Sequence, residues 1–249
     1  MILPVLETKI LYRKLLQSIK PEIVFDIGSC DGSEAIKSAQ ILPNSTVVAF
    51  EANPNNFKDI TENSDVFKYN IRVLNIAVTN IDEEVSFHVI DSNAVRNKGS
   101  SSLLDKPNFT SNKVKVKGCR LDSFVSANYR KSECLALWID VEGAGYQVLQ
   151  GIEGIKDKIA FFQIEVEENQ IWQGQRTKSE VVAFANSLNF REIARGSGSN
   201  QYDVVFVHEN YFTEELHKII RKTLLECRIR GFFAYLRDLK RKYLFKSSK

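Results

Sequence analysis

The chain has 249 residues, 43% of them hydrophobic and 26% charged, and a formal net charge of +3 at pH 7. This composition excludes collagen-like, disordered and disulfide-framed proteins, and so small a charge gives no argument for nucleic-acid binding. Without a run of about 18 uncharged apolar residues, we expect no membrane-spanning helix, and residues 1–20 lack the pattern of a secretory leader. The four cysteines are scattered, which predicts reduced thiols, no zinc site and a cytoplasmic location.

Apolar residues at helical spacing near the start predict an amphipathic packing helix within residues 1–22. Continuous apolar runs then alternate with helical periods. We expect buried strands over 23–27, 46–50, 71–77, 135–139 and 160–164, and helices over 33–41, from 54 onward and over 146–155. Strands of this kind with intervening helices predict an α/β fold built on a doubly wound, mostly parallel sheet, because such strands are buried on both faces.

An insertion separates the third predicted strand from the fourth. Residues 85–90 and 113–117 alternate between apolar and polar, as half-exposed strands do. They flank a Ser- and Asn-rich segment, 91–112, and a loop of this length in a compact domain is usually functional or disordered.

The predicted domain closes with a β-hairpin. After a helix over 178–188, residues 190–195 and 202–208 have the pattern of two strands around a glycine-rich turn. We therefore expect one domain over residues 23–210.

The remaining segment, residues 211–249, is basic. From Thr213 onward it contains 11 Lys and Arg against 4 Asp and Glu, a charge of +7, which leaves −4 on the rest of the chain. Apolar residues at helical spacing predict a basic amphipathic helical tail with a break at Gly231.

The turn after the first predicted strand combines glycines with acidic residues. Gly28 and Gly32 stand four apart beside two acidic residues, Asp26 and Asp31, and glycines at a strand-to-helix turn let a ligand approach the backbone. Glu51 ends the second strand, where a carboxylate can accept both hydroxyls of a ribose. Together these residues predict a nucleoside-cofactor site at the carboxyl edge of the sheet. The alternative is an ordinary turn that a buried Asp caps.

The spacing of the glycines indicates which nucleoside cofactor the turn would bind. A dinucleotide site typically has the spacing Gly-x-Gly-x-x-Gly, but Cys30 replaces the second glycine. Asp26 and Asp31 would repel a pyrophosphate and attract a sulfonium and an ammonium group. The pattern therefore favours S-adenosylmethionine over a nicotinamide dinucleotide.

Four blocks in this order resemble the FkbM-type methyltransferases: VFDIGS (24–29), VAFEANP (48–54), RLDSF (120–124) and IDVEGA (139–144). The resemblance implies a Rossmann-like class I methyltransferase fold, S-adenosylmethionine as donor, and O-methylation, often of a sugar hydroxyl in a glycan, glycolipid or natural product. It also implies that Asp26, Gly28 and Glu51 hold the donor, with Ala77 beside the adenine. The whole predicted donor site comprises Asp26, Gly28, Ser29, Asp31, Gly32, Glu51, Ala52, Asn53, Ala77 and Asp140. Gly145 stands where the family usually has an acidic residue.

Carboxylates at the ends of the fourth and fifth strands are the candidates for catalysis. Asp140, Glu142 and Glu165 could align an attacking hydroxyl and remove its proton. They could also hold a divalent ion such as Mg²⁺ or Ca²⁺, but we expect a site without metal. The alternative for Glu142 is a helix cap. His88, on an inserted strand, is a further candidate base, with a half-exposed structural histidine as its alternative.

Two segments are candidates for binding the acceptor. Ser101 and Ser102 belong to a Ser-Ser-Leu segment that resembles one in the family and could close over the donor. Asn169, Trp172 and Arg176 combine an amide, an indole and a guanidinium, the mixture that sugar recognition requires. The alternative is a polar loop that one Trp pins in place.

The sequence therefore predicts an S-adenosylmethionine-dependent O-methyltransferase that acts on a saccharide hydroxyl. Two alternatives stay open: a nucleoside-binding module without catalysis, and a nicotinamide-dependent oxidoreductase, which the missing glycine disfavours. The basic tail could contact an anionic inner membrane surface, which would suit a lipid-linked acceptor, form a homodimer, or cover its own domain. We expect no nucleic acid as partner, because the aromatic residues follow the apolar stripe instead of alternating with the basic ones.

Overall fold

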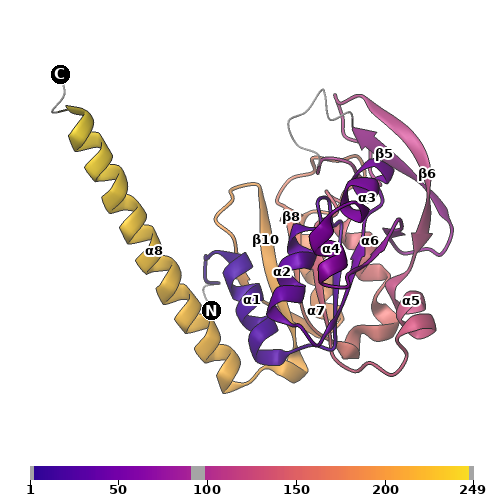
Figure 1. Cartoon of the computed structure of the whole chain (residues 1–249), viewed down its shortest axis with the longest axis horizontal. Coiled ribbons are helices and arrows are strands. Elements are labelled where there is room, and N and C mark those ends of the chain that lie inside the picture. Colours follow the sequence, from indigo (N-terminus) through magenta and orange to yellow (C-terminus); the bar gives the residue numbers. More distant parts are fainter. Residues whose placement is uncertain (1–2, 91–98, 247–249) are drawn as a thin grey trace.

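The computed structural model describes residues 3–90 and 99–246, with side chains except for 234–236 and 238–246 (Figure 1). Its centre is a seven-stranded sheet with the order β3-β2-β1-β7-β8-β10-β9. The strands are β1 (Ile23–Ile27), β2 (Thr46–Phe50), β3 (Arg72–Leu74), β7 (Leu135–Ile139), β8 (Ile159–Glu167), β9 (Phe190–Arg195) and β10 (Gln201–His208). Neighbours from β3 to β8 run parallel, whereas β10 is antiparallel to both β8 and β9. This confirms the predicted doubly wound, mostly parallel sheet with a closing hairpin.

The strand order reverses at β1. The chain builds β2 and β3 on one side of β1 and then returns to place β7 and β8 on the other side. At such a reversal the loops after neighbouring parallel strands separate, and the crevice between them is where ligands bind in open α/β sheets. The topology therefore indicates a ligand-binding site at the carboxyl ends of β1, β2 and β7.

Helices cover both faces of the sheet (Figure 1). On one face α1 (Thr8–Ile19) and α2 (Ser33–Ile41) pack against strand residues such as Val24 and Val205. On the other face α5 (Leu121–Asn128), α6 (Gly145–Gln150) and α7 (Lys178–Ser187) pack against Phe25 and Phe162. Because alternate side chains of each strand enter these two cores, the strands are apolar throughout.

Local signals set several helix starts. Asn53 accepts a hydrogen bond from the Asn55 amide (3.0 Å) and so caps α3 (Pro54–Thr61), which begins with a proline. A second short helix, α4 (Ser64–Lys68), follows it. Thr177 and Glu180 form a capping box at the start of α7.

The insertion forms a second, three-stranded sheet of β4 (Ala77–Val78), β5 (Glu84–Ile90) and β6 (Ser111–Cys119), in the order β4-β6-β5. The single strand predicted over 71–77 is wrong, since its two halves lie in different sheets as β3 and β4. Between them the side chain of Asn75 donates to the carbonyls of Glu51 (2.8 Å) and Ala52 (3.1 Å), which turns the chain out of the large sheet. The predicted helix over 146–155 likewise ends early, and a 3₁₀ helix (Glu153–Lys158) follows α6.

The basic tail forms one helix, α8 (Glu214–Lys246), and the break expected at Gly231 does not occur. Gly231 is exposed, and nothing lies within 4 Å of the position that a Cβ would take there. A glycine in such a place costs a helix only about 1 kcal/mol and leaves its backbone hydrogen bonds intact. The start of α8 packs beside α1, with Leu216 buried, and the rest projects from the body (Figure 1). Of the helices in the described residues, none is long and apolar enough to cross a membrane.

We expect Phe162→Ala to lower the free energy of unfolding by about 3–5 kcal/mol, because it would leave a cavity in a closely packed aromatic cluster. The Phe162 ring is buried, and its centroid lies 4.9 Å from those of Phe190 and Phe206. Phe67→Ala is the matched control, since that ring is 72% exposed on α4 and its removal should change stability by less than about 0.5 kcal/mol. Denaturant unfolding followed by circular dichroism measures both, and equal losses would contradict this packing.

Candidate functional site

A cavity of about 260 Å³ opens at the carboxyl ends of β1, β2 and β7. The insertion contributes one wall, through β5 and residues 99–103. The lining divides into an apolar part with Ile76, Val78, Phe87 and Leu103, and an acidic part with Glu51, Asp140, Glu142 and Glu165. The cavity therefore suits a ligand with one apolar portion and one positively charged portion.

The turn after β1 lies against the end of β7. Gly28 has a φ of +83°, and a Cβ there would be 1.8 Å from the carbonyl oxygen of Asp140, so that only glycine fits. The amides of Gly28 and Ser29 both donate to the carbonyl of Phe50 (2.9 and 3.1 Å). The Cys30 amide donates to Glu51 Oε2 (2.7 Å). These three amides are thus committed within the chain, whereas a pyrophosphate site needs amides that point at the ligand.

Several predicted donor-site residues hold this turn and do not line the cavity. Asp26 is buried and accepts hydrogen bonds from Ser29 Oγ (2.6 Å) and the Ala35 amide (3.1 Å). Burial raises the pKa of Asp26 to about 7. Asp31 accepts from a backbone amide at the start of α2, and Gly32, with a φ of +78°, leads into that helix. Asp26, Asp31 and Gly32 therefore fix the conformation of the turn and do not line the cavity.

Glu51 lines the cavity from the end of β2 and is almost fully buried. Its Oε1 accepts from the Asn53 amide (2.7 Å), as its Oε2 does from Cys30. Burial raises the pKa of this carboxyl, although both amides oppose the shift. Ala52 and Ala77 line the cavity beside it, and Asn53 lies just outside as the cap of α3.

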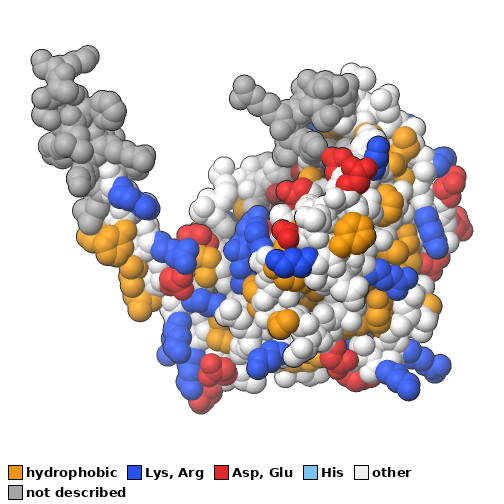
Figure 2. Space-filling view, in the orientation of Figure 1, with side chains coloured by type: hydrophobic (Ala, Val, Ile, Leu, Met, Phe, Trp, Pro, Cys, Tyr) orange, Lys and Arg blue, Asp and Glu red, His pale blue; other side chains and the backbone are white. Residues whose placement is uncertain are grey.

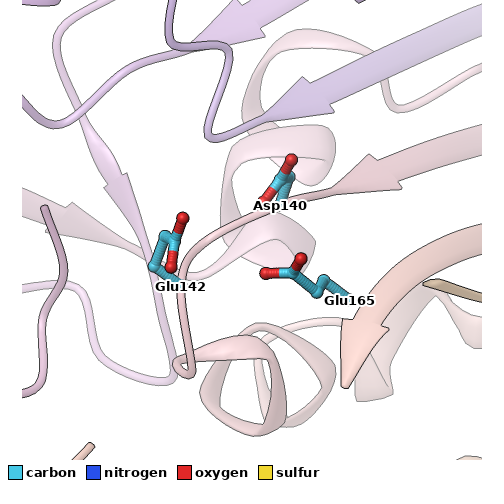
Figure 3. A group of neighbouring side chains, drawn as sticks. All are labelled: Asp140, Glu142 and Glu165. Carbon is cyan, nitrogen blue, oxygen red and sulfur yellow. The ribbon is translucent and has the colours of Figure 1, made fainter. Parts of the chain in front are cut away.

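Asp140, Glu142 and Glu165 bring their carboxylates together (Figure 3), with one oxygen of each within 4.8 Å of the others. Asp140 and Glu142 follow β7, and Glu165 belongs to β8. Glu142 has a φ of 50° and is followed by Gly143 at 84°. A left-handed residue other than glycine costs about 1–3 kcal/mol, and such residues concentrate at functional sites.

Burial and the negative charges of nearby carboxylates make these carboxyls hard to ionise. Desolvation is the main cause for each, and it raises the pKa of Glu142 to about 7, with the Asp140 charge adding to the shift. It also raises the pKa of Asp140 and of Glu165. A cation beside the cluster would relieve this repulsion. Oxygen ligands of this kind suit Mg²⁺ or Ca²⁺, and they equally suit a sulfonium or ammonium group.

The segment 99–103 joins the insertion to this cluster. Ser102 Oγ donates to the carbonyl of Glu142 (2.6 Å), and Ser101 Oγ accepts from the Ile90 amide (3.1 Å) and from Asn53 Nδ2 (3.3 Å). Ser101 lines the cavity, and Ser102 holds the segment in place. The part of the predicted loop at 91–98 lies outside the described residues.

His88 does not face the cavity. Its neighbour Phe87 does, and successive side chains of a strand point to opposite faces. His88 is buried, with Nδ1 3.1 Å from Ser111 Oγ and 3.2 Å from Asp105 Oδ1. The candidate base is therefore directed away from the carboxylate cluster, and it is not half-exposed either.

Trp172 lies in the core, not on a sugar-binding surface. It is 2% exposed, and a Cβ on Gly143 would be 2.3 Å from its Cδ1. Gln175, which sequence reasoning missed, fixes the loop by accepting from the amides of Ile171 (2.8 Å) and Trp172 (3.1 Å) and by donating to Glu167. The structure thus matches the alternative of a loop that one Trp pins, and the indole supports the turn after β7.

Asn169 and Arg176 also lie away from the cavity lining. Asn169 Nδ2 donates to Asn200 Oδ1 (2.8 Å), and Arg176 pairs with Glu180 (2.8 Å) on α7. Neither side chain reaches the carboxylate cluster in this arrangement.

Sequence reasoning also missed the apolar half of the cavity. Phe87 comes from the insertion, and Ile76 and Val78 flank Ala77 where the chain leaves the large sheet. The available signal was the apolar run at 76–78, which crosses the end of the strand predicted over 71–77. Gly145, where the family usually has an acidic residue, begins α6 against Ile164, whose Cδ1 would be 2.7 Å from a Cβ. This chain therefore has no room for that side chain without a shift.

A family model described as "Methyltransferase FkbM domain" matches residues 26–230. The 2-O-methyltransferase NoeI of Sinorhizobium fredii is 27% identical over 167 residues, which cover 63% of this chain and 68% of NoeI. Among solved structures, the N-terminal domain of EvdMO1 with SAH bound has a TM-score of 0.45 at 8% identity and covers 82% of each chain. A SAM-dependent methyltransferase from Aquifex aeolicus has a TM-score of 0.43 at 12% identity, covering 79% of this chain and 90% of its own.

We expect the free energy of unfolding of the ligand-free protein to fall as the pH rises above 4.5, the ordinary pKa of a glutamate. Folding raises the pKa of Glu165, so the folded protein binds more protons than the unfolded chain near neutral pH, and a rise in pH favours unfolding. Glu165→Gln removes this titration and should flatten the dependence between about pH 5 and about pH 8.

Denaturant unfolding in the presence of EDTA measures this pH dependence. Glu84→Gln, at an exposed position of β5, should keep the wild-type profile. A dependence that is equally steep in Glu165→Gln and in the wild type would contradict the burial of the Glu165 carboxyl.

Proposed function

The chain belongs to the family of methyltransferases with an FkbM domain and is thus an S-adenosylmethionine-dependent methyltransferase, and we propose that it methylates a hydroxyl oxygen of a saccharide. The observation that carries the proposal is the convergence of three carboxylates on a cavity at the reversal of strand order. NoeI is named a 2-O-methyltransferase, which supports oxygen as the atom that is methylated. The family argues against the nicotinamide-dependent alternative.

The residues of the cavity fit this cofactor. Gly28 presents bare backbone, and the Glu51 carboxylate lines the cavity, where it can accept hydrogen bonds from ribose hydroxyls. Ala77 and Phe87 offer an apolar wall for the adenine. The carboxylate cluster would attract a sulfonium and an ammonium group, while the turn has its amides engaged and would not hold a pyrophosphate.

When bound, S-adenosylmethionine supplies a methyl group on a positively charged sulfur. The work of the protein is then to hold the acceptor hydroxyl in line with that methyl group and to take up its proton. We assign the proton to the carboxylate of Glu142, whose pKa of about 7 suits a base at neutral pH. Asp140 and Glu165 would orient the hydroxyl, and Gln201 Nε2 holds Glu165 by a hydrogen bond of 2.9 Å. That the site works without metal stays a prediction.

Calorimetric titration with S-adenosylhomocysteine tests the donor site. We expect micromolar binding by the wild type and none of NAD. Glu51→Gln should weaken the affinity by about 10–100-fold, because a hydrogen bond to a charged group is lost. Glu62→Gln, whose side chain is 66% exposed after α3, should bind like the wild type. Equal affinity in both variants would remove Glu51 from the donor site.

Methyl transfer to a panel of saccharides tests the chemistry. Glu142→Gln should lower kcat by about 10²–10⁴-fold, the usual contribution of a general base, and should leave the affinity for S-adenosylhomocysteine within about threefold. Glu153→Gln, at an exposed position, is the control. Assays with EDTA and with added Mg²⁺ test the metal-free prediction.

Each part of the proposal has its own contrary result. Undiminished turnover by Glu142→Gln would exclude that carboxylate as the base. Turnover of other hydroxyl compounds but of no saccharide would refute the acceptor class and leave the O-methyltransferase reaction intact. Binding of S-adenosylhomocysteine without turnover on any acceptor would favour the binding-module alternative.

A further inference from the structure

Helix α8 carries an exposed apolar stripe. Leu225, Ile229, Phe232 and Phe233 are 59%, 47%, 58% and 59% exposed. Ile229, Phe232 and Phe233 stand four, seven and eight positions after Leu225, so the four side chains share one side of the helix. Figure 2 shows hydrophobic side chains on the part of α8 that projects from the body. Four large apolar side chains on one exposed helix face indicate an interaction surface.

This stripe is not the side of α8 that packs on the body. Leu216, at the start of the helix, and the partly buried Cys227 pack on the core that includes α1, and Thr223 is buried. Thr223 and Cys227 stand two positions before and after Leu225, which places them on nearly the opposite side of a helix with 3.6 residues per turn. The packing of α8 on the domain therefore leaves the stripe uncovered.

Cations surround the stripe. Arg221, Lys222 and Arg228 are exposed and stand three or four positions from Leu225, so they lie along the same side of the helix. The tail from Thr213 onward has a charge of +7 in a chain whose total is +3. An apolar stripe with basic residues along it is typical of helices that lie in the interface of an anionic membrane.

We propose that this face of α8 docks on an anionic lipid surface. The four apolar side chains enter the region between headgroups and acyl chains, while Arg221, Lys222 and Arg228 remain at the level of the phosphate groups. Charge favours this occupant over a second copy of the chain, because an anionic surface attracts a tail with a charge of +7, whereas a second tail of the same charge repels it. The inference does not depend on the proposed acceptor.

Vesicle flotation of the full chain tests the proposal. We expect binding to vesicles of phosphatidylcholine with phosphatidylglycerol, much weaker binding to phosphatidylcholine alone, and release by high salt, because salt screens the attraction. The triple variant Ile229→Ser, Phe232→Ser, Phe233→Ser should lower the partition by at least about tenfold. Phe67→Ser removes an aromatic ring that is 72% exposed elsewhere on the surface and should bind like the wild type.

A second variant separates charge from apolar contact. Arg221→Gln, Lys222→Gln, Arg228→Gln should weaken binding and reduce its salt dependence while leaving the stripe intact. Unchanged affinity for S-adenosylhomocysteine and an unchanged circular dichroism spectrum would show that both variants fold, since the altered side chains are exposed.

Three results would overturn the proposal. The first is that the wild type fails to bind anionic vesicles at low salt, and the second is that the triple variant binds as well as the wild type. The third is a wild-type dimer in sedimentation velocity that becomes a monomer in the triple variant, because the stripe would then be covered by a second copy.

Discussion

The close contact between Gly28 and the backbone of Asp140 is the constraint on which the cavity depends. A Cβ at Gly28 would sit 1.8 Å from the Asp140 carbonyl oxygen, so the turn after β1 can rest on the end of β7 only because that side chain is absent. The same turn bonds to Phe50 and Glu51 at the end of β2. Three strand ends are thereby held together where the strand order reverses, and Glu51 and Asp140 directly follow two of them.

Holding these ends together concentrates negative charge. Asp140, Glu142 and Glu165 lie close together in the cavity lining, and desolvation and nearby carboxylates raise the pKa of each. Such a cluster lowers the stability of the fold, but it can strengthen the binding of a positively charged ligand. The concentration of negative charge that destabilises the ligand-free protein would thus also attract a cationic cofactor and raise the pKa of a catalytic base.

The insertion and the loop after β8 both contact the turn after β7. Ser102 bonds to the Glu142 carbonyl (2.6 Å), and Trp172 lies against Gly143. The residues that look functional in the sequence, an indole in a polar loop and a histidine on an inserted strand, are supports here. Each is buried by packing between segments far apart in the chain, which composition and periodicity do not report.

The sequence by itself determined the parallel sheet, the glycine turn after β1, the carboxylates that follow β2 and β7 or lie near the end of β8, and the basic helical tail. Those features depend on local patterns: continuous apolar runs, residues at strand ends and charge along a helix. Only the tertiary structure decided that β3 and β4 part at Asn75, that His88 faces away from the cavity, and that the exposed stripe of α8 lies opposite its packing side. The reason is physical, because strand register, the choice of face and the burial of a helix side are set by contacts between distant segments, which local propensity does not encode.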